Sequence, residues 1–309
     1  MIGTLLIDLL FGVIQNKKVS DVMINYKKQS VKLLNGETLF YIEKGKGLKT
    51  ILLIHGNLTS SVHMVTLMDQ LMDTYRVIAP DLRGFGDSSY HQEFRSLKEL
   101  AQDIVLFCHE LKIKEAHVIG WSTGFGVAME LAILKPNLVK SLFSLEGMSV
   151  KGYYSKGRKT PIFNSYLEMS TNPVMRGIPD VLENKDYEKA KYVWENTLLI
   201  KTKIEDNLLD LYVKESLKQR CLMNINWCWV TFNLSDEPNL YVKGNGQMNL
   251  INCPVYITKG LVDNIVTPEM IDENISRLKN VEVFEFKEGS HCLHYDELES
   301  IVTLIKTHL

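Results

Sequence analysis

Four short apolar runs, each ending in glycine, aspartate or serine, constrain the fold of this chain more than any other feature. A continuous apolar run of this length is typical of a strand covered on both faces, as in a parallel sheet. Stretches with helical periodicity separate the runs, so strands and helices alternate. The apolar runs are TILLIHG (50–56), RVIAPD (76–81), HVIGWS (117–122) and KSLFSLEG (140–147), and the helical stretches are 61–73, 96–111 and 123–135. The alternation predicts an α/β protein with a mostly parallel, doubly wound sheet.

Residues 30–44 precede the parallel part and have a different pattern. Two short apolar runs flank Asn35-Gly36, which is a strong signal for a two-stranded hairpin. The strand–helix alternation stops near residue 150 and resumes at CPVYITKG (253–260). A helix opening at Pro268, a strand at 281–286 and a C-terminal helix from about 295 complete the predicted core.

The interval between these two parts is rich in Tyr, Trp, Met and Lys and is mostly helical in period, most clearly over residues 187–217. An insertion in an α/β core usually covers the carboxyl ends of the strands, where ligands bind. We therefore predict a core made of residues 1–150 and 251–309 and a helical cap at 151–250. A separately packed domain is the alternative.

Composition excludes several classes of partner. The 309 residues carry a formal net charge of −2, and no lysine- or arginine-rich run is present, so we expect no nucleic-acid partner. The five cysteines, at 108, 221, 228, 253 and 292, have no metal-ligand spacing. We expect reduced, buried thiols and a cytoplasmic location.

The N-terminal residues MIGTLLIDLLFGVIQNKK lack a basic leader and a cleavage site, which argues against a signal peptide. Their apolar run is also shorter than the roughly 20 residues that cross a bilayer. Apolar residues from Ile2 to Val13 recur at helical spacing. We expect a helix that docks on the protein or on a subunit partner in a homo-oligomer. Contact of residues 1–15 with a membrane surface is the alternative.

Ser122 lies in the Gly-x-Ser-x-Gly sequence Gly120-Trp121-Ser122-Thr123-Gly124. This pattern arises by chance in roughly one chain in ten of this length. The argument therefore depends on where Ser122 lies, between a predicted strand and a predicted helix. A serine at a sharp turn from strand to helix is held with its hydroxyl above the sheet, as a nucleophile requires. A helix N-cap is the structural alternative.

A serine hydroxyl needs a base within hydrogen-bond reach. His291 lies in the loop between the last predicted strand and the last helix, at the same sheet edge as Ser122, and we predict it as the base. His294, three residues later, is the alternative. His55 is expected to order the loop in which it lies.

The base in turn needs a carboxylate that fixes its tautomer. Asp263 follows a predicted strand directly, and the chain order Ser122, Asp263, His291 suits this architecture. Glu146, at the end of the preceding strand, is the alternative acid. For the oxyanion hole we predict the backbone amides of Asn57 and Thr123. No metal or organic cofactor is expected.

Taken together, these motifs resemble the α/β-hydrolase superfamily: His55-Gly56, DLRGFGDSS (81–89), the Ser122 turn, Asp263 and His291. The resemblance implies an α/β-hydrolase fold over residues 30–150 and 250–309. Epoxide hydrolases and haloalkane dehalogenases of this superfamily carry aspartate at the Ser122 position. Lipases with a His-Gly-Gly-Gly loop have glycine where this chain has Asn57 after His55-Gly56.

More narrowly, HGNLTSS (55–61), DLRGFGDSSYHQ (81–92), FRSLKELAQDI (94–104) and GWSTGFGVAMELA (120–132) resemble the short-chain polyhydroxybutyrate depolymerases and hydroxybutyrate oligomer hydrolases found inside bacteria. Phe125 departs from this pattern, because a further glycine is expected there, and its bulk is expected to narrow the acyl site. Trp194, Trp227 and Trp229 either line the substrate pocket or pack the cap.

The resulting hypothesis is a serine hydrolase that cleaves a small or medium ester, with short-chain hydroxyalkanoate esters or oligomers as candidate substrates. A carbon–carbon bond hydrolase, a lactonase and a thioesterase would use the same three residues. Acyl transfer to an acceptor other than water and perhydrolysis also stay open. A non-catalytic ligand receptor or scaffold on the same fold is the alternative from another class.

Overall fold

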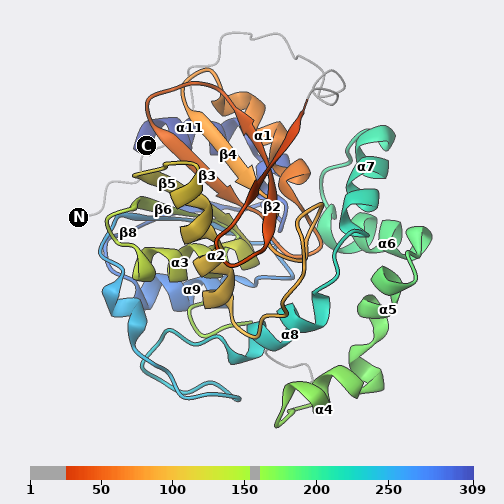
Figure 1. The fold of residues 1–309 in the computed structure, drawn as a ribbon. Helices are drawn as coiled ribbons and strands as arrows, with labels where there is room; N and C mark the ends of the chain where they lie inside the picture. The colour runs from red at the N-terminus through yellow and green to blue at the C-terminus, as the bar shows by residue number, and fades with distance from the viewer. Residues whose placement is uncertain (1–25, 154–160) are drawn as a thin grey trace.

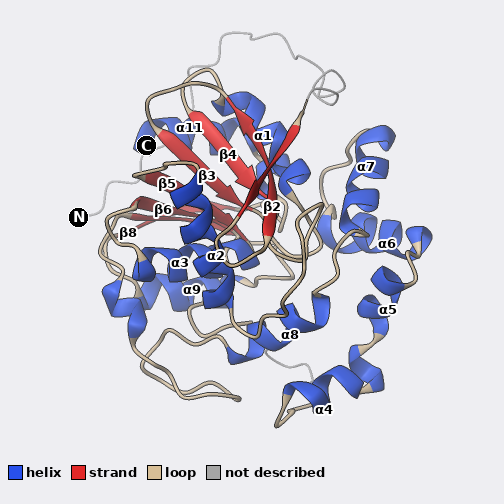
Figure 2. Cartoon of the chain, in the orientation of Figure 1, coloured by secondary structure: helices blue, strands red, loops and turns tan. Residues whose placement is uncertain are grey.

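The computed structural model describes residues 26–153 and 161–309, so the helix expected at residues 2–13 lies outside the described residues. The strands are β1 (Lys28–Lys32), β2 (Thr38–Lys44), β3 (Thr50–Ile54), β4 (Arg76–Pro80), β5 (Ala116–Trp121), β6 (Val139–Leu145), β7 (Val255–Gly260) and β8 (Val281–Phe286). In this part of the chain they form one eight-stranded sheet in the order β1-β2-β4-β3-β5-β6-β7-β8 (Figure 2). The pairings of β2 with β1 and β4 are antiparallel, and all others are parallel. The predicted mostly parallel sheet is confirmed.

The predicted hairpin joins β1 to β2. Lys32 pairs with Thr38, and the Leu33 amide donates a 2.7 Å hydrogen bond to the Glu37 carbonyl. Gly36 has a φ of 92° inside this turn, a conformation that glycine adopts without the steric cost of a side chain. Asn35-Gly36 therefore sets where the chain reverses.

Helices cover both faces of the sheet (Figure 1). On one face lie α2 (Leu97–Glu110), α3 (Thr123–Leu134) and α9 (Pro268–Arg277). On the other lie η2 (Ser61–Met64), α1 (Val65–Leu71), α10 (Leu293–Asp296) and α11 (Leu298–His308). Strand β3 shows why its apolar run is continuous. Leu52 and Ile54 pack into the first layer, while Ile51 and Leu53 pack into the second.

The chain between β6 and β7 forms a helical layer beyond the strand ends (Figure 1). Its elements are α4 (Tyr166–Thr171), η3 (Pro173–Met175), α5 (Gly177–Glu183), α6 (Tyr187–Val193), η4 (Trp194–Leu198), α7 (Asp206–Ser216), α8 (Leu222–Thr231) and η5 (Gln247–Leu250). The boundaries 151–250 predicted for the cap stay a prediction, and we call this layer the cap from here on.

The helical period predicted over residues 187–217 is wrong over 199–205. There the chain leaves the helix after a wide turn in which the Leu199 amide donates to the Trp194 carbonyl at 2.8 Å. Ile200, Thr202 and Ile204 are β-branched side chains, which lose rotamer freedom in a helix. Two shorter helices, α6 and α7, result. Among the helices described, none is long and apolar enough to cross a membrane.

Candidate active site

The order of the strands marks where a ligand site is expected. Strand β3 lies between β4 and β5, so the chain winds in opposite directions from β3 to β4 and from β4 to β5. Ligands of open α/β sheets bind at such a reversal, outside the carboxyl ends of the strands. Ser122 follows β5, and Gly56 and Asn57 follow β3. The predicted serine and the predicted oxyanion loop therefore border the same crevice.

Ser122 has a strained backbone, with φ 54° and ψ −121°. A non-glycine residue keeps such a conformation only where the surrounding structure imposes it, and the strain often marks a functional site. The Ser122 amide donates to the Leu145 carbonyl at 3.0 Å. Its hydroxyl makes no capping hydrogen bond to α3, so the geometry does not support the helix N-cap alternative.

The two glycines of the Ser122 turn are required by close packing. A Cβ atom on Gly124 would lie 2.2 Å from the Ile54 carbonyl oxygen, and one on Gly120 would lie 2.5 Å from the Cα atom of Phe125. Contacts this short would displace backbone. The turn after β5 can therefore pack against β3 only with glycine at position 124, and it can fold back onto the start of α3 only with glycine at position 120.

His291 and Asp263 are joined by a hydrogen bond of 2.8 Å from Nδ1 to Oδ2. Both residues are buried. The other carboxylate oxygen of Asp263 accepts from the backbone amides of Ile265 (2.8 Å) and Val266 (3.1 Å). The carboxylate is thus fixed on three sides, and its bond to Nδ1 leaves Nε2 as the free ring nitrogen of the imidazole.

The loop that carries His291 is tied to the Ser122 turn through Trp121. The indole Nε1 of Trp121 donates to the His291 carbonyl at 2.9 Å, and the two rings lie 5.9 Å apart. Within the described part of the chain no hydrogen bond joins the Ser122 hydroxyl to His291 itself. Catalytic hydrogen bonds are often long in the absence of substrate, and the roles of Ser122, His291 and Asp263 stay a prediction.

The alternative base, His294, has a different environment. It is fully buried, and neither ring nitrogen has a partner among the described residues. Burial lowers the pKa of His294 to about 3, with a smaller contribution from His291. Its ring packs against Trp121 at 4.5 Å and against Tyr295 at 4.4 Å.

The alternative acid, Glu146, also lies at this sheet edge but bonds to other groups. The Gly260 amide donates to it at 3.0 Å and the Thr258 hydroxyl at 2.9 Å. Burial raises the pKa of Glu146 well above its usual value, and the neighbouring Asp263 carboxylate raises it further. The structure pairs His291 with Asp263, and Glu146 is a buried neighbour of that pair.

His55 orders the predicted oxyanion loop. Its Nε2 accepts from the Leu82 amide at 3.0 Å, so Nδ1 carries the proton and donates to the Gly56 carbonyl at 2.8 Å. Burial lowers the pKa of His55 to about 4, which keeps the ring neutral at pH 7. A Cβ atom on Gly56 would lie only 3.2 Å from the Cβ atom of Ser122. The loop therefore runs directly beside the serine.

The two amides predicted for the oxyanion hole have no protein acceptor. Neither the Asn57 nor the Thr123 backbone amide donates a hydrogen bond to another group in residues 26–153 or 161–309. Thr123 is the first residue of α3, and first-turn amides point out of a helix toward an external acceptor. Both amides are thus available to a ligand, and their catalytic role stays a prediction.

Phe125 does not act as expected from the sequence. Its side chain is fully buried in the layer formed by α2 and α3, and its Cβ atom would lie 2.6 Å from a Cβ atom on Gly147. Phe125 therefore fills the core beneath the turn, and the expectation that it narrows the acyl site is not supported.

Two of the three cap tryptophans pack against other aromatic rings, and the third contacts the Ser122 turn. Trp194 is buried in the cap, where it stacks on His63 at 5.0 Å and donates to the Ser216 hydroxyl at 2.7 Å. Trp227 packs with Tyr166 and Tyr241. Only Trp229 reaches the Ser122 turn, where its Nε1 donates to the Thr123 hydroxyl at 2.7 Å.

One cap contact was not anticipated from the sequence. Gln219, in the link between α7 and α8, bonds to Asn57 and Leu58 of the oxyanion loop. The cap has no motif that singles out this glutamine, and only the fold brings positions 57 and 219 together.

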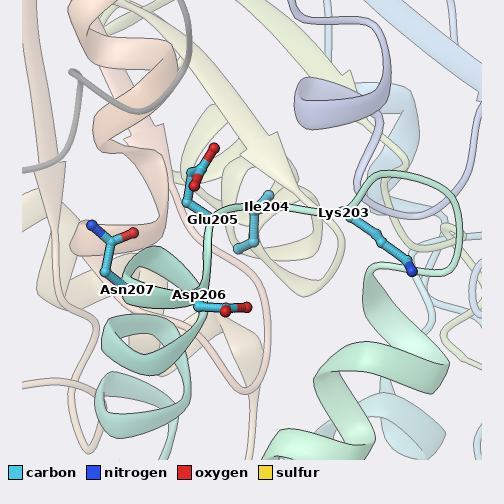
Figure 3. Close-up of a pocket in the computed structure, with 5 residues that line it drawn as sticks. All are labelled: Lys203, Ile204, Glu205, Asp206 and Asn207. Atoms are coloured by element: carbon cyan, nitrogen blue, oxygen red, sulfur yellow. The ribbon is translucent and has the colours of Figure 1, made fainter.

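A cavity in the cap lies apart from the predicted site residues. It is lined by Lys203, Ile204, Glu205, Asp206 and Asn207. Figure 3 shows that the side chains of Lys203 and Glu205 point in different directions, so they do not converge on one ligand.

The described residues contain no group of three or more His, Cys, Asp or Glu side chains placed to hold a metal ion. All five cysteines are free, and four are buried.

Known proteins resemble this chain in sequence and in fold. The chain matches two curated relatives over part of their length. It is 35% identical over 128 residues to the dihydrolipoyllysine-residue acetyltransferase component of the acetoin cleaving system of Cupriavidus necator, covering 40% of this chain and 34% of that protein. It is 32% identical over 130 residues to a soluble epoxide hydrolase of a Corynebacterium species, covering 42% and 44%. The chain thus spans less than half the length of either relative.

Structural similarity extends over nearly the whole chain. An esterase from Exiguobacterium antarcticum superposes with a TM-score of 0.73 at 16% identity, over 91% of this chain and 99% of that one. At this identity the likeness shows a shared fold. The model of the α/β hydrolase fold family matches residues 49–298. Because this match covers most of the chain, the protein belongs to the α/β-hydrolase family.

Proposed function

We propose that this protein is a serine hydrolase that cleaves a small or medium carboxylic ester through Ser122, His291 and Asp263. The observation that carries the proposal is the 2.8 Å hydrogen bond between His291 and Asp263. The loop that carries His291 is bonded to Trp121, the neighbour of Ser122, and the Ser122 hydroxyl makes no capping hydrogen bond to α3. A nucleophile, a base and a carboxylate that orients the base are the parts that acyl transfer requires.

In the proposed mechanism, Nε2 of His291 takes the proton of Ser122 as the serine oxygen attacks the ester carbonyl carbon. The carbonyl electron pair moves to oxygen, where the Asn57 and Thr123 amides bind the developing negative charge. The tetrahedral intermediate expels the alcohol, which receives the proton from His291. Water, deprotonated by His291, then attacks the acyl-serine carbonyl carbon. The bond to the Ser122 oxygen breaks, this oxygen takes the proton back from His291, and the acid leaves.

The cap contacts the segments on both sides of Ser122. Gln219 reaches the loop on the β3 side of Ser122, and Trp229 reaches Thr123 on the α3 side. The space above the serine is thus bounded by the cap on two sides. Together with the resemblance of residues 55–61, 81–92, 94–104 and 120–132 to hydroxybutyrate oligomer hydrolases, this supports short-chain hydroxyalkanoate esters or oligomers as the substrate class.

The test compares the wild-type protein with Ser122→Ala on p-nitrophenyl esters of increasing acyl length, hydroxybutyrate oligomers and lactones. We expect hydrolysis of the short esters, and its loss in Ser122→Ala by a factor of about 10⁴ or more. Ser276→Ala, which changes an exposed serine on α9, is the matched control and should keep full activity. Ester hydrolysis that survives in Ser122→Ala contradicts the mechanism.

A fluorophosphonate probe separates an enzyme from a non-catalytic receptor on the same fold. An activated serine reacts with the probe, whereas an ordinary hydroxyl stays unmodified. We expect labelling of the wild type and of Ser276→Ala and none of Ser122→Ala. Adding alcohols to the ester assay and measuring transesterification distinguishes hydrolysis from acyl transfer to another acceptor.

A further inference from the structure

The predicted oxyanion loop is held in a conformation that its own sequence does not favour. Leu58, directly after Asn57, has a φ of 57°, in the left-handed region that non-glycine residues rarely adopt. Such a residue keeps this conformation only where contacts from outside fix it. The orientation of the Asn57–Leu58 peptide therefore depends on those contacts.

The contacts come from the cap, and they bond to three separate groups of the dipeptide. Nε2 of Gln219 donates to the side-chain oxygen of Asn57 at 2.8 Å, and the Leu58 amide donates to Oε1 of Gln219 at 2.9 Å. The Ser216 hydroxyl lies 2.6 Å from the Leu58 carbonyl and 2.8 Å from the Tyr212 carbonyl, and its single proton is shared between these two acceptors. Gln219 and Ser216 are each only 2% exposed, so water does not readily replace these bonds.

The direction of the Gln219 amide follows from its partners. A backbone amide can only donate, so the glutamine oxygen must face Leu58 and the nitrogen must face Asn57. The planar side-chain amide of Gln219 thus connects the backbone of Leu58 with the side chain of Asn57. The Gln219 amide therefore bonds the Asn57–Leu58 peptide through its N–H and the Asn57 side chain through its oxygen.

The link that carries Gln219 is itself fixed to the core. The Arg220 amide donates to the Gly84 carbonyl at 2.8 Å, and the Arg220 guanidinium bonds to the carbonyls of Gly86 and Ser88. Lys218 pairs with Asp87 at 2.9 Å. Gln219 is therefore presented to the oxyanion loop from a rigid position between two anchored neighbours.

We propose that Gln219 is a positioning residue of the oxyanion hole: from the cap, it holds the Asn57 side chain and the Leu58 amide, and so fixes residue 57 with its own backbone amide toward the substrate carbonyl oxygen. Gln219 does not touch the reacting atoms. Gln219 acts through Asn57 and Leu58. A residue of the inserted segment is thus needed for the geometry of the core site. The inference rests on the proposed serine hydrolase function and extends it.

The kinetic test uses Gln219→Leu, which removes both hydrogen bonds at similar size. Because an oxyanion donor acts mainly on the transition state, we expect kcat to fall about 10- to 100-fold while KM stays within about twofold. The matched control is Gln247→Leu on η5, a half-buried glutamine of the same segment. Should a folded Gln219→Leu keep kcat within twofold of the wild type, the proposal is wrong.

A double-mutant cycle with Asn57→Ala separates positioning from general stabilisation. Asn57→Ala keeps the backbone amide and removes the acceptor of the Gln219 bond. If Gln219 acts through this residue, the two changes together should lower kcat by less than the product of their separate effects. Purely multiplicative effects overturn the proposal. If Gln219→Leu does not fold, Ser216→Ala replaces it, with a smaller fall in kcat expected.

A crystal structure of Gln219→Leu gives a readout independent of activity. The proposal expects Leu58 to leave positive φ and the Asn57 amide to turn away from Ser122. An unchanged loop overturns the positioning role, whatever the esterase assay shows. If instead the loop moves but wild-type hydrolysis proves independent of Ser122, the proposed function fails while the structural role of Gln219 stands.

Discussion

The indole nitrogen of Trp229 donates a 2.7 Å hydrogen bond to the Thr123 hydroxyl, which joins the cap to the residue next to the predicted nucleophile. The Trp229 ring also packs on Tyr153 at 5.1 Å. Its position is thus set by packing on one side and by a hydrogen bond on the other. Substitutions at this residue can separate the two contributions.

Trp229→Phe keeps an aromatic ring and removes the hydrogen bond to Thr123. Loss of one such bond costs about 1 kcal/mol of folding stability, so we expect the melting temperature to fall by about 2–4 °C. We also expect kcat/KM for short esters to fall several-fold, because the bond fixes the residue whose amide is a predicted oxyanion donor. Trp227→Phe is the control, because Trp227 packs with Tyr166 and Tyr241 instead. Equal effects of the two substitutions on kcat/KM would count against a specific role for the Thr123 contact.

Asp263→Asn tests the carboxylate predicted to orient His291. An amide in this place cannot stabilise the imidazolium and favours the wrong tautomer, so we expect kcat to fall on the order of 10⁴-fold. Stopped-flow or steady-state ester hydrolysis measures the loss. Glu146→Gln serves as the comparison, because it changes the neighbouring carboxyl group and leaves the 2.8 Å bond to His291 in place. A larger loss in Glu146→Gln would make Glu146 the functional acid.

Glu146→Gln also has a predicted effect on the pH dependence of stability. Burial raises the pKa of Glu146 well above 4.5, so the folded protein retains a proton that the unfolded chain releases. The free energy of unfolding therefore falls as the pH rises from about 4.5 toward the raised pKa, by about 1.4 kcal/mol for each pH unit in that window.

Glutamine has no proton to lose, so the variant should lack this decline. Urea unfolding at pH 5, 6 and 7 should show the stability of Glu146→Gln increasing relative to the wild type at each step. A difference that stays constant with pH is the contrary result, and it would mean that Glu146 is ionised in the folded protein.

His294→Leu is expected to stabilise the protein. Both ring nitrogens of His294 are buried without partners in the described structure, and an unsatisfied buried polar group costs about 1–3 kcal/mol. Lost ring contacts to Trp121 and Tyr295 offset part of this gain, so we expect a net increase of about 1 kcal/mol in the free energy of unfolding at pH 7.

The increase in the free energy of unfolding of His294→Leu over the wild type should be larger at acidic pH. Burial lowers the pKa of His294 to about 3, so between pH 6.5 and 3 the unfolded wild-type chain binds a proton that the folded one does not, and stability is lost as the pH falls. The exposed His109→Leu is the control. Ester hydrolysis should persist in His294→Leu, and its abolition would identify His294 rather than His291 as the base.

The parallel strands could be predicted because burial on both faces of the sheet requires apolar residues at successive positions. In β3, successive residues from Ile51 to Ile54 pack into opposite layers, so every position is apolar. Asp263 and His291 could be placed because each lies in the loop after one of these strands, and parallel strands bring their carboxyl ends to one edge. Position within the loop then favoured His291 over His294, and a place between a predicted strand and a predicted helix favoured Asp263 over Glu146.

The cap contacts could not be predicted in this way. Gln219 and Asn57 are 162 positions apart, and neither the periodicity nor the composition of the cap distinguishes Gln219. The break between α6 and α7 was also missed, because tertiary packing and β-branched residues outweighed the helical period around Ile200 and Ile204. The burial of Phe125 was misjudged because a position beside the nucleophile can face the core as readily as the ligand.

The bonds between the 218–221 link and the loop after β4 have a consequence for protein engineering. Exchanging the inserted segment between related hydrolases is an attractive route to new substrate preference, because the segment enters and leaves the core between only two strands, β6 and β7. In this protein such a transplant would also replace the residues bonded to Asn57, Leu58, Gly84 and Thr123. A chimera should therefore carry over Ser216 and the 218–221 link together with their partner loops, or treat the donor segment and the acceptor loops as one unit of recombination.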